Sequence, residues 1–398
     1  MKITNINYSD EKSGAFIAVK RINKILNKYN IKSEILVYKK IKNNLNNSTF
    51  AYFDEKIRLV FIKTLKKTLK FIFNINFMYS INFNLMPSRF YKKINKLENN
   101  IINFHWIGNE MISINQISKI NKNIIWTLHD MWPFTSVENY IDEREFLEKY
   151  VNKLEKNNFF CKYVYQKKIK NFKKVKLVIC TSKWQKRICE KSLIFKNSRK
   201  EIIPLPLNFK KWKPKKKIEI RKKYKIPLSK KVILFILSHK YAAKRKGLDI
   251  VKNYCENIKS TDICLITTNC KEIQINNKNM LHKNFDNIKS TDKMIDLYSM
   301  SDLLLMPSKL EAFGQTALEA QACNCPVVAF RNTGCEDLVK HLKTGYLSKF
   351  LNIDDFSNGI EYILNKKFQN NIIRETVIKK YSEEVIAHKY KKLFKDIF

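Results

Sequence analysis

The stretch LLLMPSKLEAFGQTALEAQACNCPVVAF, residues 303–330, decides the fold of this chain. The apolar run 303–306 stops at a proline and predicts a buried strand, and 327–330 predicts a second one. Between them, a short polar loop leads into 315–323, which is rich in Ala, Leu and Glu and therefore favours a helix. Strand, helix and strand in this order predict one βαβ unit of a parallel sheet.

The junction between loop and helix in this stretch has the properties of an anion site. The first N–H groups of a helix lack partners within it, and the positive end of the helix dipole lies beside them. Glu311 and Glu319 flank the junction. The two residues are eight positions apart, and a helix of that length would span roughly 12 Å. Two carboxylates at that spacing could bind opposite ends of one elongated ligand.

The Glu311-x7-Glu319 spacing, with Phe-Gly after the first glutamate and Pro-Val-Val after the helix, resembles the donor-binding motif of retaining glycosyltransferases of family 4. Three later elements follow at the intervals of that family: 332–334 (Asn-Thr-Gly), Asp337 and 344–347. The alternative is a pair of solvated glutamates on an ordinary surface helix.

The rest of the chain repeats the alternation of apolar runs and helical patterns, which indicates parallel sheets covered by helices. Helical periodicity starts at 13–15, and further strands are expected at 2–8, 35–38, 100–106, 124–129, 177–180, 232–237 and 263–266. Prolines and lysines without periodicity at 204–217 indicate a linker between two halves.

The resemblance implies an α/β protein of GT-B fold, in which two Rossmann-like domains have parallel sheets facing a central cleft. It implies an acceptor-binding domain at 1–207 and a nucleotide-sugar-binding domain at 208–381. The segment 382–398 is expected to be a helix that crosses back to the first domain.

Two strings of rare residues narrow the resemblance. They are HWIGN at 105–109 and WTLHDMWPFT at 126–135. Both resemble bacterial exopolysaccharide and lipopolysaccharide enzymes of the colanic-acid type. Those relatives continue with Gly-Gly-Cys, whereas this chain has SVENY at 136–140, so its acceptor side is expected to differ.

The resemblance also implies the site residues. The catalytic set is His129, Lys246 and Glu311, and the donor-binding set is Gly14, Arg245, Lys246, Phe313, Gly314, Gln315 and Glu319. Two fixed cations would stabilise the negative charge that develops on the leaving diphosphate. Glu311 would accept hydrogen bonds from the transferred sugar, and Glu319 would accept them from both ribose hydroxyls.

Each of these residues also has a simpler interpretation. His129 could be satisfied by nearby backbone, and Arg245 and Lys246 could be a solvated pair in a chain with 77 Lys and Arg residues. The family usually separates that arginine from its Lys-Gly pair, but here the two cations are adjacent. Relatives often carry two or three glycines in the loop where this chain has only Gly14.

No metal or other cofactor is expected. No Asp-x-Asp pair follows a predicted strand, and no carboxylate has the position of a covalent nucleophile of retaining hydrolases. Nine cysteines without paired spacing are typical of a reducing compartment. Neither a signal peptide nor an apolar run of about 18 residues is found, so we expect a cytoplasmic protein.

The formal net charge of +41 predicts attraction to polyanions, although a coding bias toward lysine would give the same excess. Residues 56–73 form a basic amphipathic pattern with no acidic residue. Its lysines at 56, 63, 66, 67 and 70 fall opposite Phe61, Leu65, Leu69 and Ile72 on a helical wheel. Such a helix could lie peripherally on the anionic inner face of the cytoplasmic membrane, or its apolar side could pack on the first sheet.

The function expected from these patterns is transfer of a sugar from a nucleotide sugar to a lipid-linked or oligosaccharide acceptor, in bacterial cell-surface polysaccharide synthesis. The first alternative is a nucleotide-sugar-binding protein of the same fold with epimerase-like chemistry. The second is a nucleic-acid-binding protein, which would require basic and aromatic residues interleaved on one platform or a known motif. Neither feature is found, so no nucleic-acid partner is expected.

Overall fold

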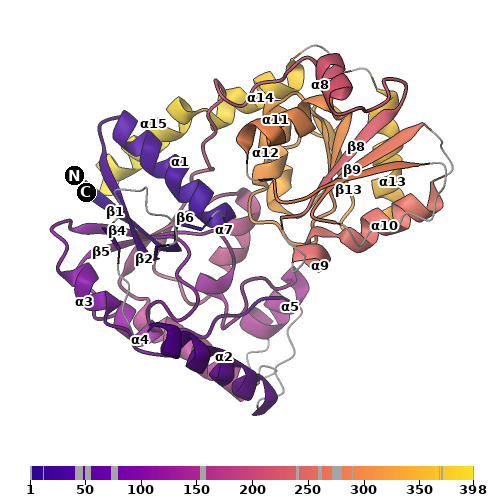
Figure 1. The fold of residues 1–398 in the computed structure, drawn as a ribbon. Helices are drawn as coiled ribbons and strands as arrows, with labels where there is room; N and C mark the ends of the chain where they lie inside the picture. The colour runs from indigo at the N-terminus through magenta and orange to yellow at the C-terminus, as the bar shows by residue number, and fades with distance from the viewer. Residues whose placement is uncertain are drawn as a thin grey trace. The chain divides into compact units, whose positions relative to one another are not determined.

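A computed structural model describes residues 2–11, 13–40, 48–49, 55–72, 79–152, 158–238, 242–258, 262–270, 280–288, 290–366, 368 and 371–397 (Figure 1). The chain divides into two compact units. The first comprises Met1–Leu205 with Ala387–Phe398, and the second comprises Pro206–Ile386. Each unit is built on one sheet of parallel strands, which confirms the expected α/β class with two Rossmann-like domains.

The first unit contains a seven-stranded sheet of order β3-β2-β1-β4-β5-β6-β7. Its strands are β1 (Lys2–Ser9), β2 (Lys32–Lys39), β3 (Ser48–Thr49), β4 (Ile101–Phe104), β5 (Asn123–Thr127), β6 (Val175–Cys180) and β7 (Arg199–Ile202). All neighbouring strands are parallel. Because β4 lies between β1 and β5, the loops that follow these three strands leave the same edge of the sheet.

Helices connect these strands. They are α1 (Gly14–Lys28), α2 (Glu55–Ile72), α3 (Phe90–Asn95), α4 (Ile114–Ile117), α5 (Glu143–Leu147), α6 (Phe159–Asn171) and α7 (Lys183–Glu190). The helix α15 (Glu383–Ile397) follows the second unit in the chain, and from Ala387 it belongs to the first. The hydroxyl of Ser13 caps α1 by accepting a hydrogen bond from the Phe16 N–H. Phe16 and Val19 of α1 then pack against β2, so capping and burial agree on where the helix begins.

The second unit contains a six-stranded sheet of order β10-β9-β8-β11-β12-β13. Its strands are β8 (Lys231–Ile236), β9 (Ile263–Thr268), β10 (Leu281–Phe285), β11 (Leu303–Met306), β12 (Val327–Phe330) and β13 (Gly345–Ser348). Its helices are α8 (Lys217–Lys223), α9 (Ala243–Lys246), α10 (Leu248–Asn257), α11 (Thr291–Met300), α12 (Gln315–Ala322), α13 (Ile353–Asn365) and α14 (Ile372–Tyr381). The opening stretch is therefore the β11-α12-β12 unit, as expected, with β11 and β12 parallel.

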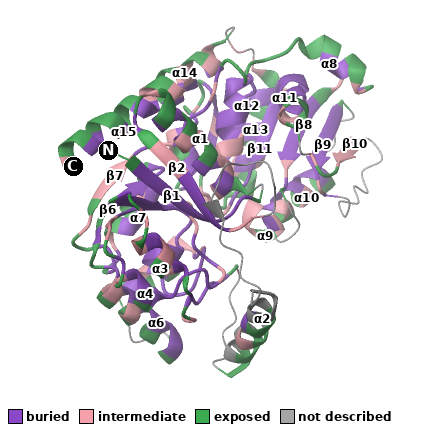
Figure 2. Cartoon of the chain, turned by 60° about the vertical axis from the view of Figure 1, so that its left-hand side comes forward, coloured by how far each residue is buried: buried purple, intermediate pink, exposed green. Residues whose placement is uncertain are grey.

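The central strands of the second unit are buried on both faces (Figure 2). Leu303, Leu305 and Val328 belong to a core that also contains Val251 of α10 and Phe356 of α13. The intervening strand residues are buried as well, which explains why these strands are continuous apolar runs rather than alternating patterns. None of the described helices combines the length and apolar character needed to cross a membrane.

Candidate active site

The loop between β11 and α12 carries Glu311 and ends at Gly314. Gly314 has φ 95° and is the N-cap of α12, which begins at Gln315. Glu311 therefore lies in the loop and Glu319 lies in the helix. The estimate of roughly 12 Å between them is wrong in its premise, because only part of the interval is helical. The structure retains the expected helix N-terminus, with the carboxylate of Glu311 before it and the carboxylate of Glu319 inside the helix.

Glu311 is the centre of a cluster of charges. Its carboxylate Oε2 lies 2.5 Å from Nζ of Lys246 and 3.8 Å from a guanidinium nitrogen of Arg245. The three side chains are only 12–17% exposed. The N–H of Phe313 also donates to this carboxylate. Burial raises the pKa of Glu311, but the two cations and these hydrogen bonds outweigh it and hold the pKa below its usual value.

Both cations reach Glu311 because α9 is attached to the same loop. The Lys309 N–H donates to the Arg245 carbonyl at 2.8 Å, and the Arg245 guanidinium donates to the Leu310 carbonyl at 2.8 Å. Gly247 ends α9 with φ 75°, in the left-handed region. A Cβ at this position would lie 2.0 Å from the carbonyl oxygen of Pro307, so a glycine is needed for this close approach.

The turn after β12 supports the Glu311 loop from behind. The Gly334 N–H donates to the Glu311 carbonyl at 2.7 Å, and a Cβ on Gly334 would lie 2.3 Å from the Ala312 carbonyl oxygen. Thr333 holds the turn by donating to the Phe330 carbonyl and accepting from the Cys335 N–H. The Asn-Thr-Gly element at 332–334 thus supports the loop that carries Glu311, which we call the carboxylate loop.

Glu319 is 9% exposed and faces α11. The hydroxyl of Tyr298 donates to its Oε2 at 3.3 Å. Burial, followed by the nearby Glu319 carboxylate, raises the pKa of Tyr298 well above its usual value, so the phenol stays a donor. This contact fixes one oxygen of Glu319 in place.

The first unit holds Gly14 and His129. Gly14 is exposed and is the first residue of α1, which follows β1. His129 lies two residues beyond β5, and its Nε2 is 2.8 Å from Nδ1 of His105, which directly follows β4. The sequence indicated His129 but gave no role to His105. Asp130 behaves as a turn residue, since it accepts hydrogen bonds from the Trp106 indole and the Trp132 N–H.

Both histidines of this pair are held in the neutral form. Burial lowers the pKa of His105 well below its usual value, and the proximity of His129 adds to this effect. Burial lowers the pKa of His129 to about 4. Two neutral imidazoles can share one hydrogen bond without the repulsion that two cations would suffer.

The neutral pair predicts that acidification destabilises the protein. In the unfolded chain each histidine has a pKa near 6.5, so between pH 6.5 and 4 the unfolded state binds more protons. The free energy of unfolding should therefore fall as pH falls through this window, by up to about 1.4 kcal/mol per pH unit for each histidine. Urea unfolding of the wild type at pH 7, 6 and 5 measures this slope.

The His129→Gln variant should show a shallower loss of stability from pH 7 to 5 than the wild type, because it lacks one of the two histidines that are held neutral. Glu311 contributes mainly below this range, because its pKa lies below its usual value. Equal slopes in the wild type and in His129→Gln would show that the pair is not held neutral.

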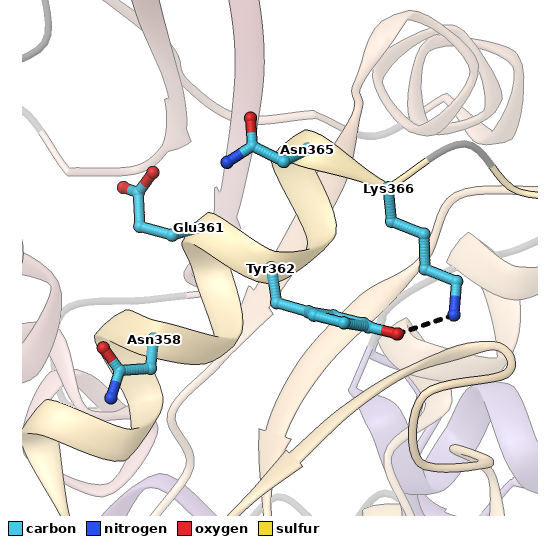
Figure 3. A pocket seen from close by; sticks show the side chains of 5 residues that line it. All are labelled: Asn358, Glu361, Tyr362, Asn365 and Lys366. Carbon is cyan, nitrogen blue, oxygen red and sulfur yellow. Dashed lines mark hydrogen bonds between the residues drawn. The ribbon is translucent and has the colours of Figure 1, made fainter.

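The structure thus brings Arg245, Lys246, Glu311 and Phe313 together within the second unit. Gly14 and His129 belong to the first unit. A pocket of about 590 Å³ lies elsewhere, along α13 (Figure 3). None of the expected site residues lines it. In the described part of the chain, no group of three or more His, Cys, Asp or Glu side chains is arranged to hold a metal ion. The expectation of a metal-free reaction stays a prediction.

A comparison with known protein families gives a match that covers most of the second unit. Residues 216–385 match the family described as glycosyl transferases group 1. The matched range contains Arg245, Lys246, Glu311 and Glu319.

Curated relatives match parts of the chain. N-acetyl-alpha-D-glucosaminyl L-malate synthase of Bacillus anthracis is 24% identical over 45% of this chain and 49% of its own length. The lipopolysaccharide 1,2-N-acetylglucosaminetransferase of Salmonella typhimurium is 32% identical over 28% of this chain and 30% of its own length. The chain thus spans about half of the first relative and less than a third of the second.

Solved structures share the whole fold. Sucrose-phosphate synthase from Thermosynechococcus elongatus superposes with a TM-score of 0.68 at 16% identity and covers 100% of this chain and 99% of its own. The Anabaena protein HepE, solved in complex with UDP and glucose, has a TM-score of 0.64 at 13% identity and covers 100% of both chains. These likenesses confirm the GT-B fold.

Proposed function

We propose that this protein is a retaining glycosyltransferase that moves a sugar from a nucleotide sugar to a lipid-linked or oligosaccharide acceptor in bacterial cell-surface polysaccharide synthesis. The observation that supports this most is the Lys246–Glu311 contact beside the N-terminus of α12. It places a cation, a carboxylate and a helix dipole within one small region. A diphosphate joined to a sugar has matching chemistry: anionic at one end and rich in hydroxyl groups at the other.

Each group of this cluster has a role in the reaction. When the bond between the anomeric carbon and the diphosphate oxygen breaks, negative charge grows on that oxygen. Lys246 and Arg245 stabilise this charge, together with the α12 dipole. An ammonium group has three donors, so Lys246 can keep its bond to Glu311 while it binds phosphate. Glu311 accepts hydrogen bonds from the sugar hydroxyls and thereby orients the ring.

Retention of configuration follows if the acceptor approaches the face that the diphosphate leaves. The acceptor oxygen then bonds to the anomeric carbon, and its proton passes to the departing phosphate oxygen, which balances the charge of the step. Neither Glu311 nor Glu319 need act as acid, base or nucleophile in this route. Glu319 instead binds the ribose through the carboxylate that Tyr298 holds in place.

The acceptor class is proposed from two observations. The strings at 105–109 and 126–135 resemble bacterial exopolysaccharide and lipopolysaccharide enzymes of the colanic-acid type. One curated relative, 26% identical over 31% of this chain, acts on a diphospho-undecaprenol acceptor according to its name. Where those enzymes have Gly-Gly-Cys, this chain has Ser136 and Glu138, which form a buried hydrogen-bond network with Tyr150. We infer an acceptor that differs from theirs.

A thermal-shift screen against UDP-, GDP-, dTDP- and CMP-sugars tests the proposed donor class. A nucleotide sugar that binds the native state raises the melting temperature. The Glu319→Gln variant should lose most of that shift, because an amide cannot accept from both ribose hydroxyls as a carboxylate does. The exposed Asp249→Asn is the matched control and should keep the shift. No shift with any of the four sugar classes would contradict the proposal.

We further propose that α2 binds the anionic membrane surface where a lipid-linked acceptor would lie. In α2, Phe61, Phe71 and Ile72 are 56%, 88% and 63% exposed, and Lys67 is exposed. The alternative, in which the apolar side packs on the first sheet, therefore fails for Phe61 and Ile72. Residue 73 and the side chains of the lysines at 56, 63, 66 and 70 lie outside the described residues.

Vesicle sedimentation distinguishes a membrane helix from general basicity. The wild type should bind phosphatidylglycerol vesicles more than phosphatidylcholine vesicles. A variant with Phe61, Phe71 and Ile72 replaced by serine should lose most of this binding, since buried apolar area adds to the charge attraction. The control replaces Ile218, Leu228 and Leu351, which are exposed in the second unit, and should bind normally. Equal binding by both triple variants would refute the assignment to α2.

A further inference from the structure

The imidazole of His129 is held from one side only. Its Nε2 contacts Nδ1 of His105 at 2.8 Å, and the two rings are stacked with their centroids 5.1 Å apart. Among the described residues, its Nδ1 takes part in no hydrogen bond. His129 is also partly exposed, whereas His105 is 2% exposed. The outer nitrogen of His129 is thus left for a ligand.

His105 is itself fixed by amide groups beneath it. Its backbone N–H donates to the Ile6 carbonyl at 3.0 Å, which anchors it beside β1. On the ring, Nε2 lies 3.0 Å from Oδ1 of Asn5 and 3.1 Å from Nδ2 of Asn103. A rotation of this ring would break its contacts with both amides and with His129.

The amides belong to a polar chain across four adjacent strands, from β5 to β2. Asn103 of β4 donates to Asn5 of β1 at 3.1 Å and accepts from the Thr127 hydroxyl of β5 at 3.0 Å. Asn5 in turn donates to the Ser33 hydroxyl at 2.8 Å. Buried polar groups are costly unless they are satisfied, and a fully satisfied network is rigid. The interior of the sheet therefore supplies a rigid base for His105.

The amides of Asn5 and Asn103 allow two arrangements of the protons in the His105–His129 pair. Nε2 of His105 lies between an amide oxygen, which accepts, and an amide nitrogen, which donates. His105 can therefore carry its proton on either nitrogen. When His105 carries its proton on Nε2, the Nε2 of His129 donates and the Nδ1 of His129 presents a lone pair. When His105 carries its proton on Nδ1, the Nε2 of His129 accepts and the Nδ1 of His129 presents an N–H. A sugar hydroxyl, which both donates and accepts, can use either form.

We propose that His105 is a positioning residue that fixes the ring of His129 and lets its Nδ1 meet a ligand as donor or acceptor. This inference rests on the proposed function, with His129 as a member of the catalytic set that the family resemblance implies. His105 acts only through His129 in this scheme and touches no substrate. Its removal should change how the sugar part of the donor is bound and leave nucleotide recognition, which belongs to Glu319, intact.

Two substitutions separate the two ends of the His105 ring. In His105→Asn the amide takes the approximate place of Nδ1 and can still bond to His129. In His105→Gln the amide reaches toward Asn5 and Asn103 and loses the bond to His129. Nitrogen-15 spectra of histidine-labelled protein report which ring nitrogens carry a proton, and the chain has six histidines. This measurement needs no ligand.

In the wild type, the spectra should show a proton shared between His105 Nδ1 and His129 Nε2, and its absence would overturn the proposal whether or not a variant folds. The His129 ring signals should change in His105→Gln and stay close to wild type in His105→Asn. Identical His129 signals in the wild type and in His105→Gln would also overturn it.

Binding adds a second test. The probe is the member of the UDP-, GDP-, dTDP- and CMP-sugar panel that stabilises the wild type most, compared with its free nucleoside diphosphate. His105→Gln should weaken binding of the nucleotide sugar about fivefold to tenfold, the effect of losing one hydrogen bond, and leave the free nucleotide unchanged. Equal weakening of both ligands would mean a merely structural role. If no sugar binds the wild type, the proposed function fails, while the spectra still decide the role of His105.

Discussion

Replacement of Lys246 by methionine should lower the rate of sugar transfer by about 10²- to 10³-fold. The ammonium group is the cation closest to Glu311, and it is 14% exposed, so water replaces it poorly. Methionine keeps most of the apolar stem, and Arg245 remains 3.8 Å from the Glu311 carboxylate. The charge on Glu311 is therefore still compensated, and the variant should fold. Initial rates at saturating donor, measured in EDTA because transfer without a metal is proposed, give the effect.

The control for this variant must remove the same charge from the same helix. Lys244 lies in α9 and is exposed. Lys244→Met lowers the net charge of +41 by one unit, as Lys246→Met does, and should retain the wild-type rate. Glu311→Gln should also lose transfer, because the neutral amide holds neither the cations nor the sugar hydroxyls as the carboxylate does. A wild-type rate in Lys246→Met would remove Lys246 from the site.

Replacement of Gly247 by alanine should lower the free energy of unfolding by about 2 to 5 kcal/mol. Two costs add. An L-residue is strained at φ 75°, and its Cβ would meet the Pro307 carbonyl oxygen at 2.0 Å. That oxygen belongs to the backbone, so no side-chain rotation can relieve the contact. Urea unfolding followed by circular dichroism measures the change.

Relief of this contact would move α9 away from the β11–α12 loop, so Gly247→Ala should also lose the thermal shift caused by a nucleotide sugar. Lys244→Ala is the matched control on the same helix, and it should stay within about 0.5 kcal/mol of the wild type. A Gly247→Ala protein as stable as the wild type would mean that α9 and Pro307 are not in close contact in solution.

The position of a strand in its sheet decides whether the sequence pattern predicts it. All nine strands that we expected lie inside the two sheets, where burial on both faces demands apolar runs. Among the described residues, the strands that we did not expect, β3, β7, β10 and β13, are the edge strands of the two sheets. Edge strands such as β7 (RKEI) and β10 (LHKNF) carry polar residues, which oppose aggregation and weaken the strand pattern.

The residues of the site also divide into those that the sequence predicts and those that it does not. Arg245, Lys246 and Glu311 could be named because local motifs of the sequence resemble those of family 4 glycosyltransferases, and the structure places the three side chains together. The bond of Glu311 to the Phe313 N–H and its brace by Gly334 depend on the path of the backbone, which no spacing reveals. His105 was hidden for another reason. Its partners Asn5 and Asn103 are polar residues inside apolar strands, and only the register of β1 and β4 brings them together.

The brace behind Glu311 has a consequence for biosynthesis. A nascent chain that has emerged as far as Ala329 already contains α9, the carboxylate loop and α12. It lacks Gly334, whose N–H holds the Glu311 carbonyl. The carboxylate loop therefore reaches its final form only after the turn that follows β12 has left the ribosome. Until then the polypeptide holds every charged group of the cluster but lacks the hydrogen bond from Gly334 that supports the Glu311 loop.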